Sequence, residues 1–546
     1  MCNSKGKILL SFFILPVLLL LTTCIDRGYI DFGKIKANKW YSAKLNEQKY
    51  YFNFTSVSKS KAEGICFIDN GRLNVNPGNV SVSNDLIKIK IDDKSDKISG
   101  KWCINDNSVI FIRSKKDSIL FKLMPEFVIP EPNDRYKKNI TEKVIRKEVN
   151  YGYARGFYTS KNVGNMNAES YPQIISGVLS ELGSNLFTDN LPLKMDIYQP
   201  KYDSVKSRPL LVLVHGGAFI VGDKRDDFQK KLAMHYAKMG YVVASINYRL
   251  GYLFIPGAYS NLERCIYRAI QDTRAAIRWL IANSKKYGID KNYIFLAGNS
   301  AGGFIALKTA FMAESESFSS ISGNLFMLQD DLGCLDCSGN NHKEKFRLKG
   351  VINMWGALTD IEMMDEFEKM PLLLIHGDSD KIVPYGFDYP FKNVGEKYSS
   401  FFSNKVYGSK PIYDKALEMG FPVSLITVQN AGHEPQVDEN NAYTPFMSQL
   451  LNAMDSFLYA QLSADTISIK NLTGNLFGIQ TNVEFDKVLW EIKGGCILDN
   501  SSDKSVRIVR FSNAGECILS ATIIQKNGIV RKTKLTLTDV KKINGN

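Results

Sequence analysis

Between residues 193 and 428 the chain alternates short apolar segments with longer segments of mixed polarity, and this alternation restricts the possible folds most strongly. One of the longer segments, Leu262–Ile281, repeats its apolar residues at helical spacing, which predicts an amphipathic helix packed on a sheet. Strands that alternate with helices indicate an α/β domain with a mostly parallel central sheet. The predicted strands are Leu193–Ile197, Leu210–Val214, Val242–Ile246, Ile294–Ala297, Gly350–Trp355, Leu372–Ile375 and Val423–Val428.

A serine flanked by glycines lies directly after one of these strands. The segment Gly298–Gly302 (GNSAG) connects the strand Ile294–Ala297 to a helix-like run, Phe304–Phe311. A Gly-x-Ser-x-Gly match is weak by itself, because a chain with 40 glycines can contain one by chance. A nucleophile elbow, however, requires this context of strand, sharp turn and helix. We therefore predict that Ser300 is a catalytic nucleophile; a glycine-rich turn is the alternative.

Small residues also follow the second predicted strand, in the segment His215–Phe219 (HGGAF). The backbone N–H groups of such a loop can approach a substrate oxygen closely. We predict that the amides of Gly217 and Ala218, together with that of Ala301, form an oxyanion hole. His215 belongs to the same loop, and we expect it to brace the loop rather than to act as a base.

An acid and a base for Ser300 are expected at the ends of the last two predicted strands. The turn after the sixth strand contains two carboxylates, and we expect Asp380 rather than Asp378 to orient the base, with His376 as a structural residue. His433 follows the seventh strand, where its imidazole could take the Ser300 proton and later donate it to the leaving alcohol.

The chain order Ser300, Asp380, His433 is that of the α/β-hydrolases, and residues from about 193 to 458 resemble the serine carboxylesterase/lipase family of this fold. The resemblance implies hydrolysis of carboxylic esters through a Ser-His-Asp triad and an acyl-enzyme, with no cofactor and no metal. Two departures are Ala218, in place of the third glycine of the oxyanion loop, and a cysteine-bearing insertion between about Met312 and Arg347. The motifs that carry the resemblance are Val214–Gly217, Asn247–Leu250, Gln271–Leu280, Gly298–Gly302 and His376–Asp380.

Strand-rich segments flank the predicted catalytic domain, which spans residues 146–460. Turn residues punctuate residues 25–130, which predicts a small all-β module. Residues 464–546 predict a β-sandwich, and Trp490 near Cys496 with Cys517 downstream is weakly similar to immunoglobulin-like modules. These modules could bind polysaccharide or a surface partner; spacing or folding support is the alternative. The predicted strands are Val80–Val82, Leu86–Ile91, Ile98–Ile104, Ser108–Ile112 and Ile119–Leu123, and then Trp490–Ile492, Val506–Phe511, Cys517–Ile524 and Val530–Leu537.

Residues 1–24 have the layout of an export signal. Lys5 and Lys7 precede an apolar run, Ile8–Leu21, that is short for a membrane span. The segment Leu21–Cys24 (LTTC) resembles the lipobox of bacterial lipoproteins, although Thr23 departs from its pattern. The sequence therefore predicts an exported protein, either secreted or held in the cell envelope by a lipid on Cys24, and membrane contact only through that anchor.

Export would permit disulfides. Pairing within domains predicts Cys66 with Cys103, Cys496 with Cys517, and a local bridge between Cys334 and Cys337, which leaves Cys265 over. A zinc site that uses Cys334, Cys337 and His342 is a weaker alternative, because the further cysteine of a zinc knuckle is missing.

Composition and charge exclude several other classes. Hydrophobic residues make up 44% and charged residues 23% of the chain, which excludes disorder, collagen and coiled coil as the main architecture. The net charge of +13 comes from scattered Lys and Arg, so we expect a solvated surface and no nucleic-acid partner.

Two rival functions share the predicted fold. A prolyl-oligopeptidase-like peptidase uses the same triad, but it would normally carry a propeller of repeated blades, and the sequence shows none. A non-catalytic adhesion protein usually lacks members of the triad, whereas all three residue types are present here. The sequence thus favours an esterase whose substrate is a small-molecule, lipid or glycan-linked ester.

Overall fold

The computed structural model describes most of the chain between residues 40 and 537. The described ranges are 40–123 and 466–537, each with gaps, and 133–161, 189–252, 259–323, 330–365, 369–395 and 398–463. The predicted export signal and the predicted lipid site at Cys24 lie outside these ranges. Among the described helices, none is long and apolar enough to cross a membrane.

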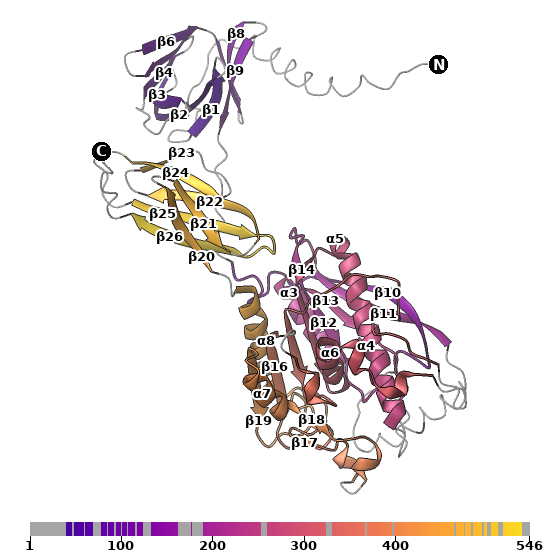
Figure 1. The fold of residues 1–546 in the computed structure, drawn as a ribbon. Helices are drawn as coiled ribbons and strands as arrows, with labels where there is room; N and C mark the ends of the chain where they lie inside the picture. The colour runs from indigo at the N-terminus through magenta and orange to yellow at the C-terminus, as the bar shows by residue number, and fades with distance from the viewer. Residues whose placement is uncertain are drawn as a thin grey trace, which may run out of the picture.

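Eight strands form the central sheet, in the order β10-β11-β13-β12-β14-β15-β16-β19 (Figure 1). From β13 to β19 every neighbouring pair is parallel, whereas β10 and β11 are antiparallel to their neighbours at one edge. This mixed, mostly parallel sheet fits the predicted α/β-hydrolase fold. The strands are β10 Val144–Gly156, β11 Asp189–Pro200, β12 Arg208–Val214, β13 Val242–Ile246, β14 Ile289–Asn299, β15 Gly350–Met354, β16 Leu372–Gly377 and β19 Val423–Val428.

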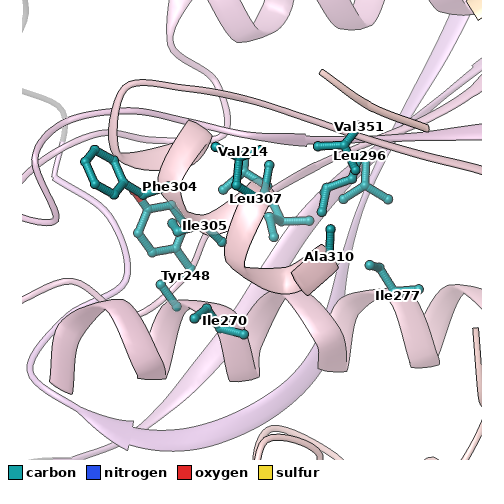
Figure 2. Close-up of a cluster of buried hydrophobic side chains, with 14 of the residues drawn as sticks. Val214, Tyr248, Ile270, Ile277, Leu296, Phe304, Ile305, Leu307, Ala310 and Val351 are labelled. Atoms are coloured by element: carbon teal, nitrogen blue, oxygen red, sulfur yellow. The ribbon is translucent and has the colours of Figure 1, made fainter. Parts of the chain in front are cut away.

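Helices cover both faces of the central sheet, because alternate residues of each strand point to opposite sides. Val212 of β12 packs in a core with α4, α6 and α7, and Leu213 packs in a second core with α3 and α8. Figure 2 shows Phe304, Ile305 and Leu307 of α6 close to α4 and the sheet. The helices are α3 Asp227–Met239, α4 Tyr259–Ala282, α5 Ser284–Tyr287, α6 Ala301–Phe311, α7 Ser409–Glu418 and α8 Phe446–Ser463.

Short elements occupy the connections between these helices and strands. A two-stranded ladder pairs β17 Phe387–Asp388 with β18 Val406–Tyr407. The 3-10 helices are Glu314–Glu316, Ser319–Ile321, Ile361–Met363, Lys392–Val394 and Ser399–Phe401.

The described N-terminal strands form one nine-stranded sheet, in the order β6-β5-β4-β3-β2-β1-β9-β8-β7. The prediction of one strand over Ile98–Ile104 is wrong, since this segment divides into β6 and β7 at opposite ends of that order. Gly100 separates them, and glycine is unfavourable inside a strand. The strands are β1 Trp40–Leu45, β2 Gln48–Val57, β3 Lys61–Ile68, β4 Gly78–Ser83, β5 Leu86–Ile91, β6 Lys94–Ser99, β7 Lys101–Asn105, β8 Ser108–Ser114 and β9 Asp117–Leu123.

Seven C-terminal strands form two sheets, ordered β20-β21-β24-β23 and β22-β25-β26. Phe477 and Val506 of the first sheet share a core with Trp490 and Leu519 of the second. The two sheets therefore pack face to face. The strands are β20 Ile467–Thr473, β21 Leu476–Thr481, β22 Phe485–Lys493, β23 Cys496–Asp499, β24 Ser505–Arg510, β25 Cys517–Gln525 and β26 Val530–Leu537.

The turn between β25 and β26 docks on the catalytic region. Ile529 is 1% exposed and belongs to the core that α3 and α8 line. Beside it, the Tyr136 hydroxyl donates a hydrogen bond to the carbonyl oxygen of Asn527 at 2.5 Å, and the Asn133 amide donates to that of Gly528 at 2.8 Å. The C-terminal strands and the central sheet thus share a buried contact.

Cysteine pairing is visible at one of the three predicted positions. Cys334 and Cys337 form a disulfide with 5.1 Å between their Cα atoms, which closes part of the insertion as a local bridge. Cys265 is a free, buried cysteine. The side chains of the other predicted pairs, Cys66 with Cys103 and Cys496 with Cys517, lie outside what the structure describes.

Candidate active site

Ser300 stands at a sharp turn between β14 and α6. Its φ of 53° is positive, a conformation that side chains other than glycine rarely adopt and that often occurs at functional sites. The flanking glycines are required sterically: a Cβ on Gly298 would lie 2.0 Å from the Gly302 carbonyl oxygen, and a Cβ on Gly302 would lie 2.1 Å from that of Val214. The local geometry is therefore that of a nucleophile elbow.

The structure brings Ser300, His433 and Asp380 into hydrogen-bond contact. His433 Nε2 lies 2.8 Å from Ser300 Oγ, and His433 Nδ1 lies 2.6 Å from Asp380 Oδ2. The three residues follow β14, β19 and β16, which all run parallel, so their carboxyl ends share one edge of the sheet. This arrangement can transfer the hydroxyl proton to the imidazole.

Asp380 is held in its ionised form. Burial by itself would raise the pKa of this carboxyl, but the charge and hydrogen bond of His433, together with His376, outweigh burial and hold the pKa well below its ordinary value. The N–H groups of Ile382 and Val383 also donate to Asp380 Oδ1, at 2.8 and 3.0 Å. His376 Nε2 lies 3.2 Å from Asp380 Oδ2, so this histidine supports the carboxylate.

The environment of His433 favours its protonated form. Burial lowers the pKa of the imidazole, but the charge and hydrogen bond of Asp380 outweigh burial, and the net effect is a raised pKa.

The other candidate acid, Asp378, contacts the loop before the histidine instead: its Oδ1 accepts a hydrogen bond from the N–H of Asn430 at 2.7 Å.

The predicted oxyanion loop lies against the elbow. A Cβ on Gly216 would come within 3.2 Å of Ser300 Cβ. Gly217 and Ala218 have φ angles of 102° and 52°, and a Cβ on Gly217 would lie 2.1 Å from the Val221 carbonyl oxygen. Among the described residues, no hydrogen-bond acceptor receives the N–H of Ala218 or of Ala301. These two amides are thus available to an oxygen beside Ser300.

Several polar residues of the motifs noted in the sequence support the loops around Ser300. The His215 ring stacks on the Tyr248 ring, with 4.4 Å between the two ring centres. The Tyr248 hydroxyl donates a hydrogen bond to the His215 carbonyl oxygen at 3.0 Å. Arg249 and Asp272 form a buried ion pair with 2.8 Å between Nη2 and Oδ1. The structure therefore places His215 in a supporting position.

A small cavity of about 40 Å³ opens beside the serine. Ser300 and Ala218 form part of its wall, and the rest of the wall is mostly apolar and includes Ile266, Phe304 and Val406. A second cavity of about 250 Å³ adjoins it and shares Ile266 and Val406 as wall residues.

Sequence reasoning did not predict these cavity residues. Ile266 was expected only as part of the packing face of its helix, and Val406 lies in a two-residue strand without a pattern of its own. Phe391 also lines the small cavity. It belongs to an aromatic-rich segment after Asp380, and the sequence alone leaves a cover over the active site and ordinary core packing equally open for that segment.

The chain matches known esterases over its central part. Residues 195–370 match the family model described as BD-FAE. The chain is 35% identical to Carboxylesterase 3B of Mus musculus over 116 residues, which is 21% of this chain and 19% of the mouse protein. It is 30% identical to Esterase LipC of Mycobacterium tuberculosis over 133 residues, 24% of this chain and 30% of that protein. With Esterase LipQ of the same organism it shares 28% identity over 208 residues, 35% of this chain and 46% of LipQ.

The match thus spans less than half the length of each of these relatives. Among solved structures, the apo form of Thermogutta terrifontis esterase 2 is 18% identical at a TM-score of 0.36, covering 50% of this chain and 90% of that one. The family model and the curated relatives support the predicted resemblance: the central part of the chain is similar to α/β-hydrolase carboxylesterases.

Proposed function

We propose that the protein hydrolyses carboxylic esters with Ser300 as nucleophile, His433 as general base and acid, and Asp380 as the residue that orients the imidazole. The observation that carries this proposal is the continuous chain of hydrogen-bond contacts, 2.8 Å from Ser300 Oγ to His433 Nε2 and 2.6 Å from His433 Nδ1 to Asp380 Oδ2. The sequence similarity to carboxylesterases supports the same chemistry.

The reaction has two halves. Ser300 Oγ attacks the ester carbonyl carbon while its proton moves to His433 Nε2, and the carbonyl oxygen becomes an oxyanion held by the amides of Gly217, Ala218 and Ala301. His433 then gives the proton to the departing alcohol, which leaves an acyl-enzyme. Water, deprotonated by the same imidazole, attacks the acyl group and releases the acid and the free Ser300 hydroxyl.

The size of the cavity favours short acyl groups. A volume of about 40 Å³ has room for roughly three water-sized groups, since each needs about 10–15 Å³ on this measure. Because the alcohol must leave first, we assign this small pocket to the acyl side of the ester. We expect acetyl and propionyl esters to fit this pocket and hexanoyl esters to be excluded. The natural ester is a small molecule, a lipid or a glycan-linked group.

A substrate panel tests the reaction. Nitrophenyl and sugar-linked esters, with a prolyl nitroanilide for the peptidase rival, are incubated with wild type and Ser300→Ala. We expect ester turnover by the wild type that falls by about 10³-fold or more in the variant. Equal turnover by the two proteins would refute the mechanism, and faster cleavage of the anilide would favour the peptidase.

We also propose that the protein is exported, either as a secreted protein or as a lipoprotein modified at Cys24. Radiolabelled palmitate incorporated by cells that express the wild type but not Cys24→Ala would identify the lipoprotein form. A cytoplasmic product that retains residues 1–24 would contradict export.

The domain boundaries 25–130, 146–460 and 464–546 remain part of this proposal, with an immunoglobulin-like sandwich at the C-terminus. The sheet orders β20-β21-β24-β23 and β22-β25-β26 support that type, because constant-type immunoglobulin domains order their seven strands ABED and CFG. Binding of polysaccharide by the flanking modules is tested by retention of the full chain on insoluble glycans. No retention would contradict carbohydrate binding.

A further inference from the structure

Arg268 of α4 is a buried cation without a carboxylate partner among the described residues. Its side chain is 5% exposed. The guanidinium donates a hydrogen bond to Cys265 Sγ at 3.1 Å and lies 5.8 Å from the centre of the Phe157 ring. Its Nε is buried, and no acceptor for it occurs in the part of the chain that the structure describes. Burial raises the pKa of the Cys265 thiol, so the sulfur stays neutral. This arrangement lowers the stability of the folded state, because burying a charge without a partner of opposite charge costs free energy.

A second guanidinium lies one helical turn before Arg268. Arg264 is 4% exposed and donates hydrogen bonds to the carbonyl oxygens of Ser320 and Ile321, at 2.8 and 3.1 Å. These acceptors are neutral. Burial, and after it the charge of Arg268, lowers the pKa of Arg264. Two buried like charges four residues apart on a helix repel each other.

Both arginines line a cavity of about 480 Å³, together with Arg155 and Arg249. Arg249 is paired with Asp272, with 2.8 Å between Nη2 and Oδ1. Arg155 is paired with Asp330, with 3.3 Å between Nη1 and Oδ2. Asp331 is the remaining carboxylate of the lining, and its Oδ1 accepts a hydrogen bond from the N–H of Gly333. Four guanidiniums thus stand against three carboxylates, which leaves an uncompensated positive charge at Arg268 and Arg264.

We propose that this cavity binds a small oxyanion, a carboxylate or a phosphate, through Arg268 and Arg264. The planar donor fork of a guanidinium matches the two oxygens of such an anion, and the added negative charge would balance the cluster. The site is distinct from the catalytic pocket: Leu262 and Ile266 of the same helix line the cavity beside Ser300, whereas Arg264 and Arg268 line this one.

The wild-type chain provides the first test. Its thermal unfolding is measured in sodium phosphate, sodium sulfate and sodium acetate, each against sodium chloride at equal ionic strength. Near a hundred times the dissociation constant, we expect Tm to increase by about 2–4 °C with at least one oxyanion. Isothermal titration with the same anion should give one site per chain. A larger effect of phosphate than of acetate would identify a phosphate site, and the reverse a carboxylate site. Equal Tm values in all four salts would overturn the proposal.

Variants separate an anion site from a structural arginine. Arg268→Met should keep or raise Tm in chloride, because it removes an unpaired buried charge, and it should abolish the response to the oxyanion. Arg274→Gln is the matched control, since Arg274 lies on the same helix but pairs with Asp336 outside this cavity; it should respond as the wild type does. A variant Arg268→Met that unfolds at lower temperature, or that keeps the full response, would contradict the site. Should it not fold, Arg268→Lys replaces it, and the proposal then requires a weakened response.

Discussion

Two carboxylates in one turn have different partners, and we expect this difference to set their roles. Asp380 Oδ2 lies 2.6 Å from His433 Nδ1, whereas Asp378 Oδ1 accepts the N–H of Asn430. We predict that Asp380→Asn lowers kcat by about 10⁴-fold, the loss that follows when the orienting carboxylate of a triad is removed. Asp378→Asn should lower it by less than about tenfold, because a surface hydrogen bond is worth roughly 1 kcal/mol. Steady-state rates on nitrophenyl acetate measure both; the opposite ranking would reverse the assignment of the acid.

The raised pKa of His433 predicts the pH dependence of the reaction. The imidazole must be neutral to accept the Ser300 proton, so kcat/KM should fall as pH drops through the pKa of the free enzyme. Because Asp380 holds that pKa above its ordinary value of 6.5, the midpoint of the acid limb should lie above pH 6.5. Asp380→Asn should move the midpoint to lower pH. A midpoint well below 6.5 in the wild type would show that another group controls this limb.

At the scale of elements, α4 contributes to the walls of both the cavity beside Ser300 and its larger neighbour. Ile266 lines both cavities and is 2% exposed. We predict that Ile266→Ala joins the two spaces and raises the rate ratio of hexanoate to acetate esters by about tenfold or more, since each methylene in an apolar pocket is worth about 1–3 kcal/mol.

The control for this prediction is Ile277→Ala. Ile277 lies on the same helix, is fully buried and lines neither cavity. Both variants should cost about 2–5 kcal/mol in unfolding free energy, but the control should leave the ratio unchanged. Equal ratios for wild type and Ile266→Ala would remove this helix from the selection of acyl groups.

The sequence predicts elements best where local chemistry demands one geometry. The elbow around Ser300 needs glycine at positions 298 and 302, so its motif is visible, as are the apolar strands β13 and β19, which have the predicted bounds. β10 was not predicted as a strand, because charged residues such as Arg146 and Lys147 occupy this exposed edge of the sheet. The cavity wall was also missed, since Ile266 and Val406 come together only through the fold.

At the scale of the whole molecule, the C-terminal strands stabilise the catalytic region. Ile529 contributes its side chain to the core of α3 and α8, although it lies in a turn of the sandwich. We predict that Ile529→Ala lowers the unfolding free energy of the full chain by about 2–5 kcal/mol, measured by denaturant titration. Leu472→Ala is the control, because Leu472 is 57% exposed and should cost little. An unchanged midpoint for Ile529→Ala would mean that the two parts unfold independently.

This docking contact could not be predicted from the sequence. Tyr136 and Asn527 are 391 residues apart, and neither belongs to a motif. The three side chains of the proposed triad lie at shorter separations, 133 residues from Ser300 to His433 and 53 from Asp380 to His433, and the order of the motifs predicts that they meet.

Covalent labelling tests most directly whether the Ser300 hydroxyl is nucleophilic because the imidazole at 433 activates it. The full chain is treated with a fluorophosphonate, and the modified residue is located by mass spectrometry of its peptides. We predict one adduct per chain on Ser300, formed at a rate that falls by about 10³-fold or more in His433→Ala, with unlabelled Ser300→Ala as the blank. An adduct on another residue, or a labelling rate unaffected by His433→Ala, would contradict the account.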